Sequence, residues 1–384
     1  LKDTDRFAWA PRMDLWFIAQ QARKTLPERY IGMSMAELAL EMGFACHAVR
    51  GDFTLERRPG DLALRGLGFD NHPDYPYRVE LRDLPMTYRQ DGYRHTTRIE
   101  TSAGEITFSL QLTPDMAASG ISLPFVLSYP VESVDDLDRV AEVFEHLEVI
   151  PTADAYSSFH QRVGTNGVAV ANGCIAASPV HLLLHELMPM DRFYYAYHDS
   201  HERIAEFSRR VTPFFDSLLD ASLLSEAEVI LWGANFDRDL TWPPFFETEI
   251  LPWLQKVARR MHDSHRLLLC HTDGENGGLA HLYRQSGFDV AESFCPSPMT
   301  SVPLSIFRED LGGHSCIWGG VPSVALLPDS CSSETFDRLI DDLDRELGTQ
   351  GDRLSPLVLG VSDNVPPDAD LARLAALTRL CNRQ

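Results

Sequence analysis

The chain has 384 residues, of which 44% are apolar, and its 34 Lys and Arg against 56 Asp and Glu give a formal net charge of −22. These proportions are those of a globular protein and exclude wholesale disorder. Nucleic acids and anionic lipid surfaces attract basic proteins, so the acidic balance excludes both as expected partners.

The expected location is the reducing cytoplasm. No apolar stretch approaches the ~20 residues that cross a bilayer, and residues 1–10 lack the basic and apolar pattern of a signal peptide. The seven cysteines are odd in number and scattered along the chain, which is not the pattern of a disulfide framework.

The N-terminal region is predicted to combine helices with a small antiparallel sheet. Residues 12–44 carry apolar side chains at helical spacing in two pieces, which Pro27 separates. Residues 78–112 hold short segments rich in Val, Tyr, Thr and Ile, interrupted by Asp91-Gly92 and by 102–104. Asp-Gly between such segments is a hairpin signal. We therefore predict an extension of this kind within residues 1–130.

From about residue 135, short apolar runs alternate with amphipathic segments. This alternation predicts βα units and a parallel sheet. The number of units favours a TIM (β/α)₈ barrel over residues 131–384, ahead of a doubly wound sheet. The runs predicted as strands are 168–171, 229–232, 267–269, 290–291, 316–318 and 357–359. The segments predicted as helices are 201–223, 245–263, 277–286, 334–347 and 368–380.

Polar side chains follow five of the six predicted strands, and the run 316–318 is followed by Gly319-Gly320. In a parallel barrel the carboxyl ends of the strands meet at one rim, where active sites lie, so residues that are distant in sequence would gather there. This convergence predicts an enzyme without the help of any single motif. The polar side chains that follow the runs are Asn172, Asn235, Asp237, His271, Asp273, Glu292, Cys295, Ser362 and Asp363.

Separated blocks of the chain resemble one known superfamily. Residues 16–28, Trp-Phe-Ile-Ala-Gln-Gln-Ala-Arg-Lys-Thr-Leu-Pro-Glu, are similar to the N-terminal signature of uroporphyrinogen decarboxylases. The later blocks, in the order and spacing of that superfamily, are 271–274, 287–289, 319–322 and 360–367. The resemblance covers about residues 10–380 and implies a TIM barrel. It also implies one of two chemistries, namely porphyrinogen decarboxylation or methyl transfer that involves a corrinoid protein.

The departures from the decarboxylase pattern favour the methyltransferase branch. Of the two arginines that hold substrate carboxylates in the decarboxylase signature, the first is replaced by Ala19 and only Arg23 remains. The Gly-His-Gly block of decarboxylases reads Gly-Val-Ser at 360–362. A chain of charge −22 would also repel a substrate with eight carboxylates. Segments 243–247 and 292–296, by contrast, resemble the methyltransferases.

The resemblance leaves the presence of a metal open. Thiol-methylating members hold zinc through His-x-Cys and a later cysteine, and zinc favours the thiolate. Here the pattern is His271-x-Asp273, and no cysteine stands at the later position. One interpretation is a harder zinc site that adds Glu247 or Cys295 to this pair. The other is a metal-free site in which Asp273 and Asn235 form hydrogen bonds with a substrate or a pterin.

We predict a methyltransferase that moves a methyl group between a small methylated substrate and a corrinoid protein or another carrier. The chain lacks the Asp-x-His-x-x-Gly corrinoid motif, so a separate protein would have to present a corrinoid. The predicted catalytic residues are His271, Asp273, Asn235 and Asp363. The predicted substrate-binding residues are Arg23, Asp237, Glu292, Trp242 and Trp318.

Two alternatives remain open at this point. The first is a decarboxylase, or another proton-transfer lyase, that acts on a small carboxylate held by Arg23. The second is a non-catalytic barrel that binds a tetrapyrrole, a pterin or a partner protein. A homodimer is also open, because many barrels pair through exposed faces.

Overall fold

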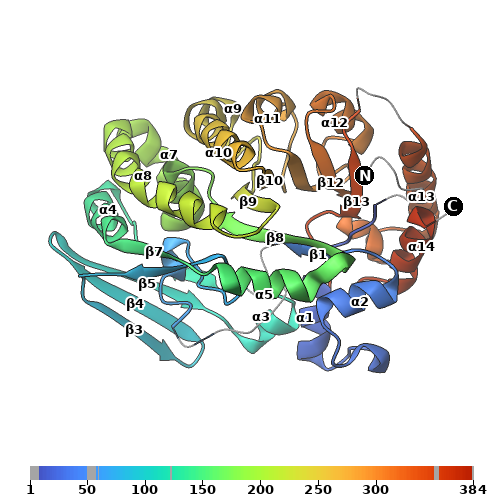
Figure 1. The fold of residues 1–384 in the computed structure, drawn as a ribbon, viewed down its shortest axis with the longest axis horizontal. Coiled ribbons are helices and arrows are strands. Elements are labelled where there is room, and N and C mark those ends of the chain that lie inside the picture. Colours follow the sequence, from blue (N-terminus) through green and yellow to red (C-terminus); the bar gives the residue numbers. More distant parts are fainter. Residues whose placement is uncertain (1–7, 50–57, 59, 122, 350–353, 383–384) are drawn as a thin grey trace.

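The computed structural model describes residues 8–49, 58, 60–121, 123–349 and 354–382. In this part of the chain, seven parallel strands form one curled sheet in the order β1-β8-β9-β10-β11-β12-β13 (Figure 1). All the apolar runs expected as strands lie in this sheet, and β1 is an addition to them. The strands are β1 (Cys46–Val49), β8 (Gly167–Cys174), β9 (Val229–Ala234), β10 (Leu267–His271), β11 (Val290–Phe294), β12 (Cys316–Val321) and β13 (Leu357–Val361).

The closed barrel of eight strands expected from the sequence is not observed. The described residues instead form a curled half-barrel of seven strands. A short segment at Trp9 lies between the two edge strands instead of an eighth strand. The amide of Ala10 donates to the carbonyl of Leu359 in β13 at 2.9 Å, and the amide of Ala45 donates to the carbonyl of Trp9 at 3.0 Å. Ala10 is followed by Pro11, which has no amide hydrogen and cannot extend a strand ladder.

Helices cover the outer face of this sheet (Figure 1). Helix α10 buries Leu254, Val257, Ala258 and Met261, which are spaced three and four residues apart and so form one apolar stripe. The helices of this layer are α5 (Ala153–Val163), α6 (Pro179–Leu182), α7 (Met190–Asp199), α8 (His201–Leu223), α9 (Pro243–Phe245), α10 (Leu251–Asp263), α11 (Ala280–Ser286), α12 (Leu304–Leu311), α13 (Ser333–Gly348) and α14 (Leu371–Cys381). The expected helices 201–223, 334–347 and 368–380 match α8, α13 and α14 closely.

Two helices precede β1, as the spacing of apolar residues predicts. They are α1 (Asp14–Arg23) and α2 (Met35–Met42). Helix α2 begins at a capping box, in which the Ser34 side chain accepts from the amide of Glu37, and ends at Gly43 in the left-handed conformation with φ of 82°. Pro27 lies between the two helices and precedes a single 3₁₀ turn, Glu28–Tyr30.

The antiparallel extension is also confirmed. Four strands pair in the order β3-β4-β5-β6 beside the main sheet (Figure 1), and Asp91-Gly92 forms the first hairpin turn. These strands are β3 (Met86–Asp91), β4 (Arg94–Thr101), β5 (Gly104–Gln111) and β6 (Phe125–Ser128). Helix α3 (Pro114–Ala118) connects β5 to β6, and helix α4 (Leu137–Glu145) comes after β6. A separate pair joins β2 (Tyr77–Leu81) to β7 (Leu147–Pro151). Thus β1 and β7 both reach across the predicted boundary at residue 130, and the division into two domains stays a prediction.

The interior of the curled sheet is apolar below its carboxyl rim. Val170, Leu231, Leu269 and Trp318 form one buried cluster there with their neighbours. The polar side chains expected at the rim lie above this cluster, and His47 of β1 packs against Trp318 within it. Among the described residues, no helix has both the length and the apolar character needed to cross a membrane.

Candidate active site at the carboxyl rim

Three side chains from distant parts of the chain meet at the carboxyl rim. His271 ends β10, Asp273 follows it, and Asp363 follows β13. One potential ligand atom from each side chain lies within 4.8 Å of the others. His271 is buried, whereas the two carboxylates are partly accessible. These three residues, here called the rim triad, form an accessible cluster at the edge of an apolar interior.

Glu292, a buried residue of β11, contacts the imidazole of His271 and fixes its position. Oε2 of Glu292 lies 2.5 Å from Nδ1 of His271, and Oε1 lies 2.8 Å from Nε2 of His47 in β1. Burial alone would raise the pKa of Glu292, but the charge of His271 and hydrogen bonds from both histidines lower it well below its usual value. Glu292 is therefore a carboxylate that bridges two imidazoles, and Nε2 of His271 remains for a ligand.

Asp363 lies in the loop after β13, and its backbone conformation fixes its position. Its φ of 54° is left-handed, a conformation that Asp tolerates better than most residues. Its amide donates to Oγ of Ser293 at 2.7 Å. Nη1 of Arg12 lies 3.6 Å from Oδ1 of Asp363, while Nε of the same guanidinium donates to Oδ1 of Asp14 at 2.8 Å. The buried guanidinium of Arg12 therefore lies beside the carboxylate of Asp363 in the rim triad.

Asp273 carries a carboxylate with a perturbed pKa. Burial, with the charges of Asp363 and Glu292, raises its pKa against the opposing influence of His271. Sγ of Cys295 lies 3.3 Å from Oδ1 of Asp273 and donates to it. Burial, together with this neighbouring carboxylate, raises the pKa of the Cys295 thiol. Cys295 is therefore a neutral thiol at the edge of the rim triad.

The rim triad has the donor atoms of a site for a divalent cation. One imidazole nitrogen and two carboxylate oxygens suit zinc and other divalent transition metals. In metal sites, a ligating histidine commonly gives its other ring nitrogen to a carboxylate, and His271 does so with Glu292. The donor set therefore fits a cation held by His271, Asp273 and Asp363, with Cys295 beside them.

Asn235 lies close to this site but faces another group of residues. Its amide hydrogen is donated to the carbonyl of His271 at 2.9 Å, whereas its side chain contacts Nε2 of His185 at 2.8 Å. Nδ1 of His185 lies 2.8 Å from Oε1 of Glu186, and Oε2 of Glu186 accepts from Nη1 of Arg65 at 2.5 Å. We call this chain of four residues the Asn235–Arg65 relay.

The other predicted site residues do not join the rim triad. The exposed Arg23 donates to Asp368 and to the carbonyl of Ala118. Asp237 accepts from the amides of its own loop and of Glu275, so it organises a turn.

Glu247 and the two tryptophans also lie apart from the rim triad. Glu247 is exposed on the π-helical turn Phe246–Ile250, with His281 at 3.9 Å. Trp242 stacks on Phe245, and Trp318 donates to the carbonyl of Ala10 inside the curl, where its ring centroid lies 4.5 Å from that of His47.

Three residues beside the site carry no motif in the sequence. His47 lies in a strand of only four residues, too short for its periodicity to be recognised. Arg12 precedes the first helix, and Glu186 lies in a π-helical turn, Leu183–Leu187, beside the two histidines at 181 and 185. His181 and His185 stand four residues apart in the sequence, and His185 belongs to the Asn235–Arg65 relay.

Comparison with solved structures shows the fold. No protein-family model matches the sequence, and a search of curated proteins finds no similar one. Among solved structures, a methyltransferase from Methanosarcina mazei matches over 99% of this chain and 94% of its own, with a TM-score of 0.55 and 16% sequence identity. At that identity the likeness establishes a shared architecture along nearly the whole of both chains.

Proposed function

We propose that this protein is a methyltransferase that uses the rim triad to move a methyl group between a small methylated substrate and a corrinoid protein or another carrier. The observation that carries the proposal is the convergence of His271, Asp273 and Asp363 within 4.8 Å at the carboxyl rim. The architecture shared with a methyltransferase of nearly the same extent supports it.

The rim triad, Glu292 and Arg12 would have different roles in this reaction. His271, Asp273 and Asp363 would hold a divalent cation, which supplies Lewis acidity toward an oxygen, nitrogen or sulfur of the substrate. Glu292 orients His271 and keeps Nδ1 occupied, so that Nε2 is directed outward. The apolar interior beneath the rim excludes water from one side of the reacting groups. Arg12 limits the repulsion between the two carboxylates by standing beside Asp363.

One observation favours a second candidate, decarboxylation of a small carboxylate. Asp273 has a raised pKa, which suits a general acid that protonates a carbanion. Arg12, rather than the Arg23 expected from the sequence, is the cation next to the site. Its pairing with Asp14 and Asp363 already uses much of its charge, so we rank this candidate second.

The test combines metal content with turnover. Protein stripped by chelator and dialysed against zinc should bind one equivalent per chain, and His271→Ala and Asp363→Asn should each lose it. With the metal restored, small methylated compounds should transfer methyl to cob(I)alamin, read as the appearance of methylcobalamin absorbance. Release of CO₂ from small carboxylates without methyl transfer would select the decarboxylase. Neither reaction in the metal-loaded protein would reject both enzymes in favour of a binding protein.

A further inference from the structure

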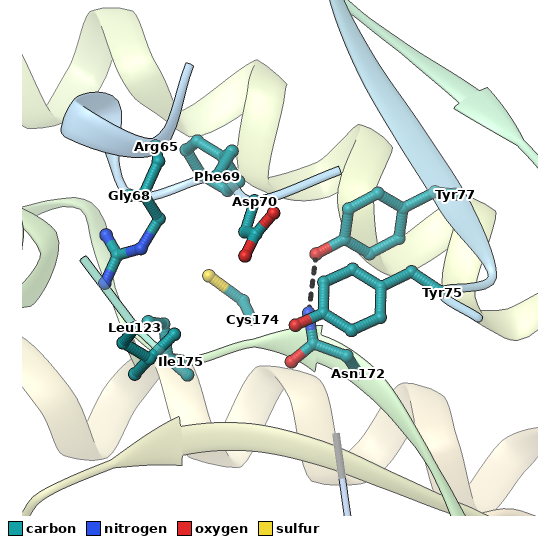
Figure 2. A pocket seen from close by; sticks show the side chains of 10 residues that line it. All are labelled: Arg65, Gly68, Phe69, Asp70, Tyr75, Tyr77, Leu123, Asn172, Cys174 and Ile175. Atoms are coloured by element: carbon teal, nitrogen blue, oxygen red, sulfur yellow. Dashed lines mark hydrogen bonds between the residues drawn. The ribbon is translucent and has the colours of Figure 1, made fainter. Parts of the chain in front are cut away.

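A small cavity lies at the carboxyl end of β8, against the segment that leads into β2 (Figure 2). Its volume of about 30 Å³ has room for about two waters or an organic molecule of two or three heavy atoms. Its polar walls include Arg65, Asp70 and Asn172, and its apolar walls include Phe69 and Ile175. No residue of the rim triad lines this cavity, so it is a second candidate site.

One buried acceptor in this cavity has no partner among the described residues. Asn172 is 7% exposed, and nothing in that part of the chain donates to its Oδ1. Tyr77 gives its hydroxyl proton to the carbonyl of Gly173 at 2.6 Å, so the Asn172 atom that lies 3.2 Å from that hydroxyl is the donating Nδ2 (Figure 2). This assignment leaves Oδ1 as a pure acceptor. A buried acceptor without a partner costs stability, and a donor from a ligand removes that cost.

The local backbone holds Asn172 at the wall of the cavity. The pairing of β8 with β9 shifts register between Asn172 and Cys174, so the strand bulges at Gly173. Bulges of this kind re-aim side chains and are common beside binding sites. A Cβ at Gly173 would lie 2.7 Å from the carbonyl of Leu231, so this close approach requires glycine. The position of Asn172 is thus built into the strand.

Two opposite charges line the same cavity. Arg65 donates from Nη1 to Glu186 at 2.5 Å, and because a guanidinium has five N–H donors, others remain for a ligand. Figure 2 shows the Asp70 carboxylate pointing into the cavity, and a carboxylate accepts several hydrogen bonds at once. The Cys174 thiol adds no charge, since burial raises its pKa to about 12. The walls therefore offer a cationic donor, an anionic acceptor and the neutral acceptor of Asn172.

We propose that this cavity binds a primary amide of formamide size, whose NH₂ group donates to Oδ1 of Asn172 and to Asp70 and whose carbonyl accepts from Arg65. The NH₂ group supplies the donor that Asn172 lacks. An ion would be attracted by one of the two wall charges and repelled by the other, whereas a neutral, dipolar amide turns its favourable end to each. The site goes beyond the proposed function, because binding there does not depend on methyl transfer at the rim triad.

The test compares three planar molecules of similar size that differ in their donors and charge. Formamide has an acceptor and an NH₂ donor, formate has acceptors and a negative charge, and formamidinium has donors and a positive charge. Each is titrated into the chelator-treated full chain by saturation-transfer NMR. Formamide should bind saturably, with an affinity that its small size limits to roughly millimolar.

Formate and formamidinium should each bind at least about tenfold more weakly than formamide. Formate has no donor for Asn172 and is repelled by Asp70, and formamidinium has no acceptor for Arg65 and is repelled by its charge. Equal or tighter binding of either ion would overturn the proposal. The absence of saturable formamide binding would overturn it as well, because water alone would then fill the cavity.

Substitution of Asn172 locates the bound amide. Asn172→Leu should weaken formamide binding about tenfold, since the change removes the acceptor for the NH₂ group. Asn382→Leu, the same change at an exposed residue outside the cavity, should bind formamide as the wild type does. Unchanged formamide binding in a folded Asn172→Leu protein would reject the site. Loss of formamide binding in His271→Ala would place the ligand at the rim triad and would also reject it.

Asp70→Asn tests the charge balance without altering Asn172. Removal of the carboxylate leaves Arg65 as the charge on the wall, so formate should gain at least about tenfold in affinity relative to formamide. The same order and spacing of the three affinities in this variant as in the wild type would contradict the roles assigned to Asp70 and Arg65.

Discussion

Oε2 of Glu292 lies 2.5 Å from Nδ1 of His271, and this contact decides which nitrogen of the histidine is available at the site. The other carboxylate oxygen of Glu292 is 2.8 Å from His47, so the glutamate cannot swing away without breaking a second hydrogen bond. The orientation of the one nitrogen donor in the rim triad therefore depends on Glu292, a residue outside the triad.

Glu292→Gln should lower the affinity of the rim triad for zinc by about 10–100-fold, because the residue behind a ligating histidine fixes its tautomer and raises its basicity. Competition with a chromophoric chelator measures the change. Glu247→Gln is the matched control, since Glu247 is exposed and outside the cluster, and its affinity should equal that of the wild type. Equal affinities in the two variants would refute a positioning role for Glu292.

Glu186 should make stability depend on acidic pH. Burial alone would raise its pKa, but the charge of Arg65 and hydrogen bonds from His185 and Arg65 lower it from 4.5 to about 2. A lowered pKa gives stability that is complete above 4.5 and is lost as the pH falls toward 2. The free energy of unfolding of the wild type should therefore fall by up to about 3 kcal/mol more than that of Glu186→Gln over this range.

Urea unfolding at a series of pH values measures this difference. Glu186→Gln should already be the less stable protein at neutral pH, because Arg65 is left buried without its charged partner. Glu132→Gln, which removes an exposed ion pair with Arg192, should run parallel to the wild type. Parallel curves for Glu186→Gln as well would contradict the coupling between Glu186 and its two neighbours.

Gly319→Ala should destabilise the fold by about 1–3 kcal/mol. Gly319 in β12 has φ of 151°, and a Cβ there would lie 2.7 Å from the amide nitrogen of Phe294. Gly348→Ala is the control, because a Cβ at this last residue of α13 would meet nothing within 4 Å. Its free energy of unfolding should be unchanged or rise by up to about 1 kcal/mol. Chemical denaturation that ranks the two variants the other way would show that the close contact of β12 with β11 is dispensable.

Arg23→Ala should affect neither zinc affinity nor the KM of any substrate. Its guanidinium joins α1 to Asp368 and to the end of α3, and it lies outside the rim triad. The loss of a partly exposed ion pair should cost no more than about 1 kcal/mol of stability. Steady-state kinetics and calorimetry on the same preparation check both statements. A large rise in the KM of a carboxylate substrate in this variant alone would revive the carboxylate clamp expected from the resemblance.

The local properties of the chain were open to prediction from its sequence. Strand runs such as 229–232 and the helix 201–223 are encoded by apolar periodicity, and the hairpin at Asp91-Gly92 by turn chemistry. The prediction that His271, Asp273 and Asp363 gather at one rim followed from the same logic, since parallel strands present their carboxyl ends together.

Only the tertiary structure decided which of the rim residues touch one another. It brought Glu292 between two histidines, placed Arg12 rather than Arg23 beside the carboxylates, and turned Asn235 toward His185. It also left seven strands where eight were expected in the described part of the chain. Each of these outcomes depends on strand register, bulges and side-chain packing between segments far apart in the chain. Periodicity reports which face of an element is buried, and it carries no information about the partner that the face meets.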